Sequence, residues 1–163
     1  MLGRRTIIAC AALVLGGCGF EPLYAARTTA NATAELASIR VEPIAERSGQ
    51  LLRGNLIDRF GTSRDQRYVL RIRLVEPRQA LALRRDDVIT RSSYSVTANY
   101  ELFAVGGGRI HSGFSTLSTD YEITNSEFAS IASRDSARVR TLESLSDDIR
   151  QQLAVFFADR QAR

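Results

Sequence analysis

Alternation of apolar and polar residues predicts four strands in this chain, at 37–44, 68–75, 88–105 and 109–123. In the second stretch Tyr68, Leu70, Ile72 and Leu74 share one face, and arginines occupy the other. In the third, the apolar set is Tyr94, Val96, Ala98, Tyr100, Leu102 and Ala104. Pro43 places the first strand at a sheet edge or ends it there. The glycines 106–108 predict a tight hairpin between the last two strands.

Two further patterns concern the strand ends. Beyond Pro77, the alternating Leu81 and Leu83 continue the second strand after a bend, and residues 84–87 form a charged turn. In the fourth strand Ile110 and Phe114 lie on one face, and the many Ser and Thr residues make the other face wet.

Spacings of three and four residues predict two helices. The first covers 46–60 through Leu52, Leu56 and Phe60, with Ser48 as N-cap and Gly61 as C-cap. The second ends the chain, after a first turn capped by Asn125 or Ser126 and an interruption at 133–135. Its stripe comprises Val139, Leu142, Leu145, Ile149, Leu153 and Phe156. The order is therefore β-α-β-β-β-α, an α+β domain over 36–163. Both helices pack on one face of a four-stranded, mostly antiparallel sheet.

The first 17 residues have the pattern of a signal peptide. Arg4 and Arg5 precede ten uncharged residues, Thr6 to Leu15, which are too few for a permanent span of about 20 residues. The stretch Leu15-Gly16-Gly17-Cys18 resembles a lipobox, in which cleavage between Gly17 and Cys18 follows lipidation of the Cys18 thiol. An ordinary secretory signal with a chance Cys is the alternative, and a twin-arginine signal has less support.

Cleavage there leaves a chain with one Cys, so no internal disulfide forms and lipidation accounts for the odd Cys. Residues 18–35 are then the lipidated N-terminus and tether, with the small and polar run 25–34 as a flexible connection. The mature chain carries 20 Arg against 18 acidic residues, a net charge too small to indicate nucleic acid. The chain contains no Lys, a bias that indicates either selection for phosphate-binding Arg or a GC-rich genome.

The sequence contains no recognisable catalytic constellation. His111 and Ser112 are neighbours on a strand and point to opposite faces, so they are not a nucleophile and base. The acidic pairs 86–87 and 147–148 fit a turn and a helix surface. One His and no free Cys exclude the usual zinc sets. We therefore expect a binding or structural protein, not an enzyme, with no metal and no cofactor beyond the lipid on Cys18.

The lipobox, the element order and the start Cys18-Gly19-Phe20-Glu21-Pro22-Leu23-Tyr24 together resemble the LptE family of lipopolysaccharide-assembly lipoproteins. The C-terminal Leu145–Arg150 and Leu153 also look like that family. The resemblance implies an exported protein that is lipid-anchored in the outer membrane. It further implies a partner, the LptD β-barrel, which the domain plugs and helps to assemble, and binding of lipopolysaccharide. Gly19 after the lipidated Cys agrees with outer-membrane sorting.

Lipopolysaccharide carries phosphates, which arginine binds bidentately. The candidates cluster around the second and third predicted strands and are Arg71, Arg73, Arg78, Arg84, Arg85 and Arg91. Each of them could instead be a solubilising surface charge. Two other functions stay open: an auxiliary lipoprotein of an ABC-type lipid transporter, and a lipid-anchored periplasmic enzyme.

Overall fold

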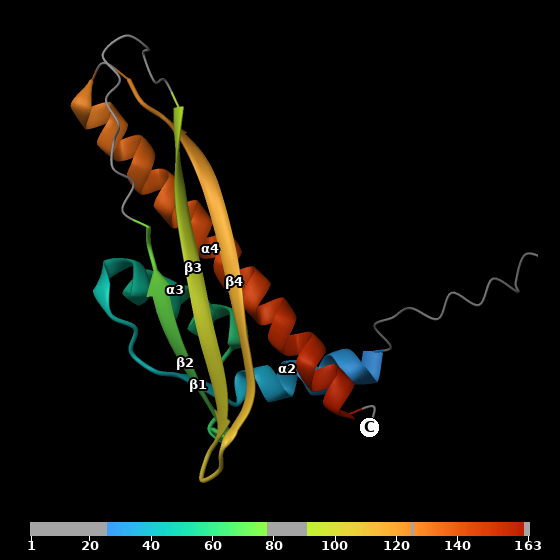
Figure 1. Cartoon of the computed structure of the whole chain (residues 1–163). Helices are drawn as coiled ribbons and strands as arrows, with labels where there is room; N and C mark the ends of the chain where they lie inside the picture. The colour runs from blue at the N-terminus through green and yellow to red at the C-terminus, as the bar shows by residue number, and fades with distance from the viewer. Residues whose placement is uncertain (1–25, 78–90, 125, 162–163) are drawn as a thin grey trace, which may run out of the picture.

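A four-stranded sheet backed by three helices forms the domain (Figure 1). The computed structural model describes residues 26–77, 91–124 and 126–161. The elements are α2 (Ala26–Ala37), β1 (Ile39–Val41), α3 (Glu46–Phe60), β2 (Tyr68–Val75), β3 (Arg91–Ala104), β4 (Arg109–Glu122) and α4 (Glu127–Gln161). The strand order is β1-β2-β3-β4, with β1 parallel to β2 and the other pairs antiparallel. The predicted α+β class is confirmed.

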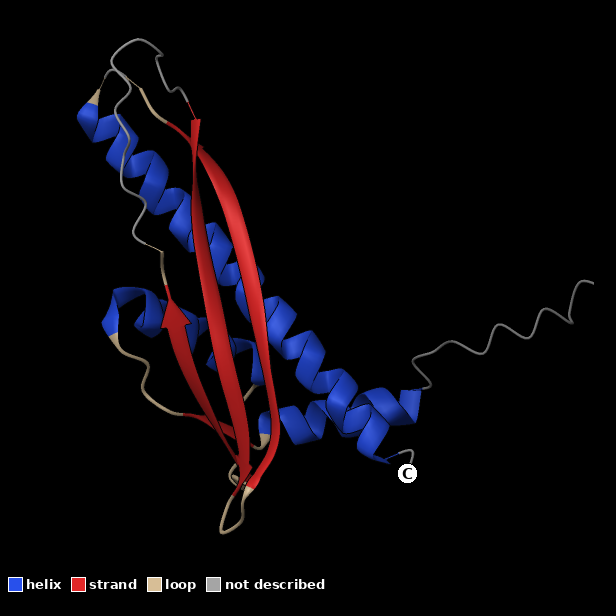
Figure 2. Ribbon diagram, in the orientation of Figure 1, coloured by secondary structure: helices blue, strands red, loops and turns tan. Residues whose placement is uncertain are grey.

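The apolar alternation of β2 and β3 builds the floor of the core. Leu70 pairs with Leu102 and Ile72 with Tyr100, so the two apolar sets lie side by side. Leu70, Val96 and Leu102 are fully buried. Figure 2 shows the helices gathered behind the sheet, so this face is covered and the opposite face is left open.

The 35-residue helix α4 supplies the other half of the core. Its fully buried large apolar residues follow the predicted spacing and are Leu142, Leu145, Ile149 and Leu153. At the ends the stripe differs from the prediction, because Val139 is 43% exposed and Phe157 is more deeply buried than Phe156. The predicted interruption at 133–135 is wrong. That stretch contains no Gly or Pro, and Asp135 forms an i,i+3 ion pair with Arg138.

Helix α2 contradicts the prediction of a flexible connection at 25–34 and of only two helices. Its sequence, ARTTANATAELA, contains five alanines, and alanine has the highest helix propensity of all residues. Ala32 and Leu36 are buried, and α2 packs against α4 and α3. The ordered domain therefore begins earlier in the chain than residue 36.

Two further boundaries depend on local chemistry. β1 is shorter than predicted: Glu42 N–H still donates to Leu70 O, but Pro43 has no N–H with which to continue the ladder. The N-cap of α3 is Ala45 and not Ser48, whereas Gly61 caps the C-terminus at φ 77° as predicted. The expected extension at 81–83 and the charged turn at 84–87 lie outside the described residues.

The hairpin between β3 and β4 contains an irregularity that changes which side chains face the helices. Leu102 pairs with His111, but the next residue, Phe103, pairs with Arg109, so Ile110 is an extra residue on β4. The prediction that Ile110 and Phe114 share a face is wrong for this reason. Ile110 packs against the core, whereas Phe114 is 68% exposed on the open face.

A matched pair of substitutions tests whether α2 belongs to the domain. Ala32 is buried and Ala34 exposed on the same helix. We expect Ala32→Asp to lower the free energy of unfolding by about 2 kcal/mol, because it buries an unpaired carboxylate or detaches α2. Ala34→Asp should change it by less than about 0.5 kcal/mol. Equal effects in urea unfolding would show that α2 does not pack on the domain.

Candidate functional site

The open face of the sheet is polar along most of its length. Its side chains come from alternate positions of β2, β3 and β4, and Thr97 and Thr116 share a hydrogen bond of 2.9 Å across β3 and β4. The prediction that the wet face of β4 lies opposite Phe114 is wrong, because Phe114 itself lies on the open face with Thr116, whereas Ser115 on the helix side is buried. An antiparallel sheet with one face on the core commonly leaves the other to water or to a partner.

Three arginines gather at one part of this face. Arg71 Nε donates to Glu42 Oε2 at 3.0 Å, and its guanidinium lies 4.6 Å from the centre of the Phe103 ring. Arg73 is exposed, and Arg109 pairs with Glu101. Together with Asn99, Ser112 and Phe114, they line a depression of about 650 Å³, here called the open-face hollow.

The structure brings together only some of the predicted arginines. Arg71 and Arg73 line the open-face hollow, but Arg91 lies at the start of β3 opposite Glu122. It is eight residues along β3 from Asn99, the partner of Arg73, or about 27 Å. Arg78, Arg84 and Arg85 lie outside the described residues. Arg109 was not among the predicted ligands, since only the extra residue Ile110 places it beside Phe103 on the open face.

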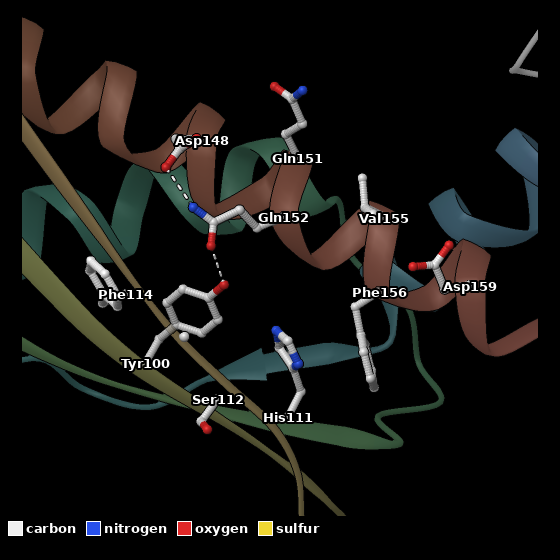
Figure 3. A pocket seen from close by; sticks show the side chains of 11 residues that line it. Tyr100, His111, Ser112, Phe114, Asp148, Gln151, Gln152, Val155, Phe156 and Asp159 are labelled. Atoms are coloured by element: carbon white, nitrogen blue, oxygen red, sulfur yellow. Dashed lines mark hydrogen bonds between the residues drawn. The ribbon is translucent and has the colours of Figure 1, made fainter.

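A second depression of about 540 Å³ lies between β4 and α4, here called the helix-side hollow. Figure 3 shows Tyr100 and His111 facing side chains of α4 across it. Tyr100 O–H donates to Gln152 Oε1 at 2.5 Å, and Gln152 Nε2 donates to Asp148 Oδ2 at 2.8 Å. Ser115 donates to the same oxygen of Asp148. The network joins β3, β4 and α4.

Aromatic stacking closes one end of this hollow. The rings of His111 and Phe156 are 4.4 Å apart and nearly parallel, and burial lowers the pKa of His111. The imidazole is therefore neutral at pH 7. Burial also raises the pKa of Tyr100, helped by the nearby charge of Asp148, so its hydroxyl stays protonated.

In each of the two neighbouring residue pairs considered for catalysis, the two side chains point in different directions. Figure 3 shows His111 directed toward α4, whereas Ser112 points away from it. Asp147 pairs with Arg59 of α3, and the hydrogen bond from Arg59 lowers its pKa. Asp148 instead faces β4. Neither pair has the geometry of a nucleophile with its base or of two facing carboxylates.

Among the described residues, no cluster of three or more His, Cys, Asp or Glu side chains could hold a metal ion. The same part of the chain contains no helix that is long and apolar enough to cross a bilayer.

Comparison with known proteins places the fold among bacterial lipoproteins of known structure. A chain from Caulobacter crescentus CB15 named "putative lipoprotein" has a TM-score of 0.66 at 22% identity and covers 80% of this chain and 98% of its own. Rare lipoprotein B from Shewanella oneidensis has a TM-score of 0.57 at 14% identity, and the match covers 76% of this chain and 98% of that protein. A minor lipoprotein from Acinetobacter baumannii has a TM-score of 0.53 at 16% identity, and the match covers 73% of this chain and 92% of that protein.

These identities establish a common fold and nothing finer. The likeness extends over nearly the whole length of each of the three lipoproteins, so the shared unit is the domain itself. No protein-family model matches the chain, and no curated protein sequence matches it.

The single histidine gives a clean test of the helix-side hollow. Because burial lowers the folded pKa of His111, the unfolded chain binds more protons just below pH 6.5, and stability rises with pH there. We expect an NMR titration midpoint for His111 below 6.5 and loss of this pH-dependent rise in His111→Gln. A midpoint at or above 6.5 would contradict the buried stack.

Proposed function

We propose that this chain is a lipoprotein of the outer membrane that acts as LptE does: it binds the LptD β-barrel, plugs its lumen and assists lipopolysaccharide assembly. Two observations support the proposal together. The sequence has Leu15-Gly16-Gly17-Cys18 followed by the start typical of that family. The domain has the fold of bacterial lipoproteins, including rare lipoprotein B. Binding, and not catalysis, is the role that these features favour.

The position of the helices agrees with an anchor at one end of the domain. Helix α2 lies beside the C-terminal end of α4 (Figure 1), so the chain enters the domain at that end. Only eight residue steps separate Cys18 from Ala26, which limits the lipid to about 28 Å from the start of α2. A lipidated Cys18 would hold this end near the bilayer and direct the opposite end away from it.

The open face supplies the surface that such a role needs. A barrel lumen is polar, and a sheet face of Ser, Thr, Asn and Arg suits contact with it. The open-face hollow adds three guanidinium groups, the side chain best matched to phosphate oxygens. Arg73 has the fewest competing contacts, because Arg71 and Arg109 already pair with Glu42 and Glu101. We infer that Arg73 is the foremost phosphate ligand of the described set.

The partner is tested by purifying the tagged chain from membranes in mild detergent and quantifying what co-purifies by mass spectrometry. We expect one large outer-membrane β-barrel in stoichiometric amount. Inner-membrane ATPase or permease subunits instead would favour the auxiliary role in lipid transport and contradict the proposal. Cys18→Ala is the matched control: it should leave the membrane fraction, because the lipid is lost, yet stay folded by circular dichroism.

Charge reversal on the open face tests lipopolysaccharide binding. We expect Arg73→Glu to weaken binding to the purified protein about fivefold, the effect of losing one exposed phosphate contact. Arg140→Glu makes the same charge change on an exposed position of α4 and should alter binding less than about twofold. Equal effects of the two variants in a titration with labelled lipopolysaccharide would remove the open-face hollow as the site.

A further inference from the structure

The outer edge of β4 is an unprotected strand edge. In the described part of the chain, β4 is the last strand of the sheet (Figure 2). Apart from its ladder with β3, no main-chain hydrogen bond from another described element reaches residues 111–117. Edge strands are usually protected by charges, prolines or bulges. From Ser112 to Thr119, β4 has eight residues in a row with no charge and no proline, and its irregularity at Ile110 lies before them.

The two hollows flank this edge on opposite sides. The helix-side hollow and the open-face hollow share Tyr100, Ser112, Gly113 and Phe114. A strand added beside β4 would direct successive side chains to opposite faces of the sheet. Its side chains would therefore enter the helix-side hollow and the open-face hollow in turn. Pockets for alternate side chains are what give specificity when a sheet binds an extended peptide.

Gly113 is the residue at which both hollows meet. A Cβ atom there would lie 2.5 Å from the Tyr100 hydroxyl oxygen, so this position excludes larger residues. The Tyr100 side chain fills the space above Gly113, and its hydroxyl donates to Gln152 Oε1, which fixes the wall of the helix-side hollow.

The hollows differ in charge. The helix-side hollow contains Asp148 and Asp159 and no Arg, and its one histidine is neutral. The open-face hollow contains three arginines and a single acid, Glu101. An incoming strand would match both if a basic side chain pointed toward α4 and an acidic neighbour pointed toward the open face.

We propose that the outer edge of β4, from His111 to Leu117, binds an extended segment of a partner polypeptide as a fifth strand. Adjacent basic and acidic side chains of that segment enter the helix-side hollow and the open-face hollow, respectively. Main-chain hydrogen bonds to β4 supply the affinity, and Asp159 and Arg73 select the charges. The proposal concerns an edge of the sheet and does not depend on the identity of the barrel or on lipopolysaccharide binding.

The test uses the full-length chain in mild detergent and a fluorescent peptide, acetyl-TVTREVTV-amide, whose adjacent basic and acidic residues fall on opposite faces of a strand. We expect saturable binding below about 100 μM, with slower amide hydrogen exchange in 111–117. Two further peptides carry N-methyl groups at the odd-numbered or at the even-numbered residues, so each has lost the N–H donors of one strand edge. One of the two should bind at least about tenfold more weakly than the parent peptide. The charge-free peptide TVTQQVTV should bind about fivefold more weakly.

Matched protein variants locate the side-chain contacts. We expect Asp159→Asn and Arg73→Gln each to weaken peptide binding about threefold, because each removes one exposed charge from a hollow. Glu143→Gln and Arg140→Gln, on the exposed part of α4, should leave it unchanged.

Three results would overturn the proposal. One is absence of binding up to about 1 mM peptide. Another is equal binding of the peptide and both N-methylated forms, since main-chain pairing would then contribute nothing. The third is sedimentation of the unliganded protein as a dimer with residues 111–117 already protected from exchange, because a second copy would then occupy the edge. Loss of barrel co-purification would leave all these measurements unaffected.

Discussion

The burial of one face of α4 is the contact on which the rest of the structure depends. Four leucine and isoleucine side chains of this helix are completely buried, at spacings of three and four, and each contributes about 2 kcal/mol by leaving water. The same helix contacts β4, β3, α3 and α2, so every layer of the domain meets it. Because all the helices gather around this stripe, only one face of the sheet is covered.

The exposed parts of the molecule follow from that arrangement. With the helices on one side, the arginines of β2 and β4 point to a face that nothing in the described chain covers. The network from Tyr100 of β3 and Ser115 of β4 to Gln152 and Asp148 then holds both strands against α4. The outer edge of β4 is left between two depressions of opposite charge. A polar face and an accessible edge are features of a protein that binds other molecules.

Periodicity predicted the elements well where one residue pattern dominates. The limits of β2 and of α3 are those expected, because clean alternation and a stripe closed by Gly61 leave few alternatives. Helix α2 was not predicted because a run of small residues is compatible with either a linker or a helix. The packing of Ala32 and Leu36 on the domain stabilises the helix, and the sequence alone does not show that packing. The continuous α4 shows that polar residues alone do not end a helix.

The candidate site was less predictable than the fold. Arg71 and Arg73 follow from the alternation of β2, and the structure places both on the open face. The face of the sheet on which Arg109 and Phe114 lie, relative to each other, depends instead on one extra residue in β4. A periodic sequence pattern does not indicate such an irregularity. The helix-side hollow depends on which α4 residues meet β4, and this is set by packing across the whole domain.

We propose above that the open face meets a large β-barrel in the outer membrane. The most direct measurement replaces exposed Phe114 with a photoreactive phenylalanine analogue and cross-links in intact cells. We expect one main adduct, containing this chain and an outer-membrane β-barrel, and its loss when the analogue is moved to exposed Arg140. Adducts only with inner-membrane transporter subunits, or equal barrel adducts from both positions, would contradict it.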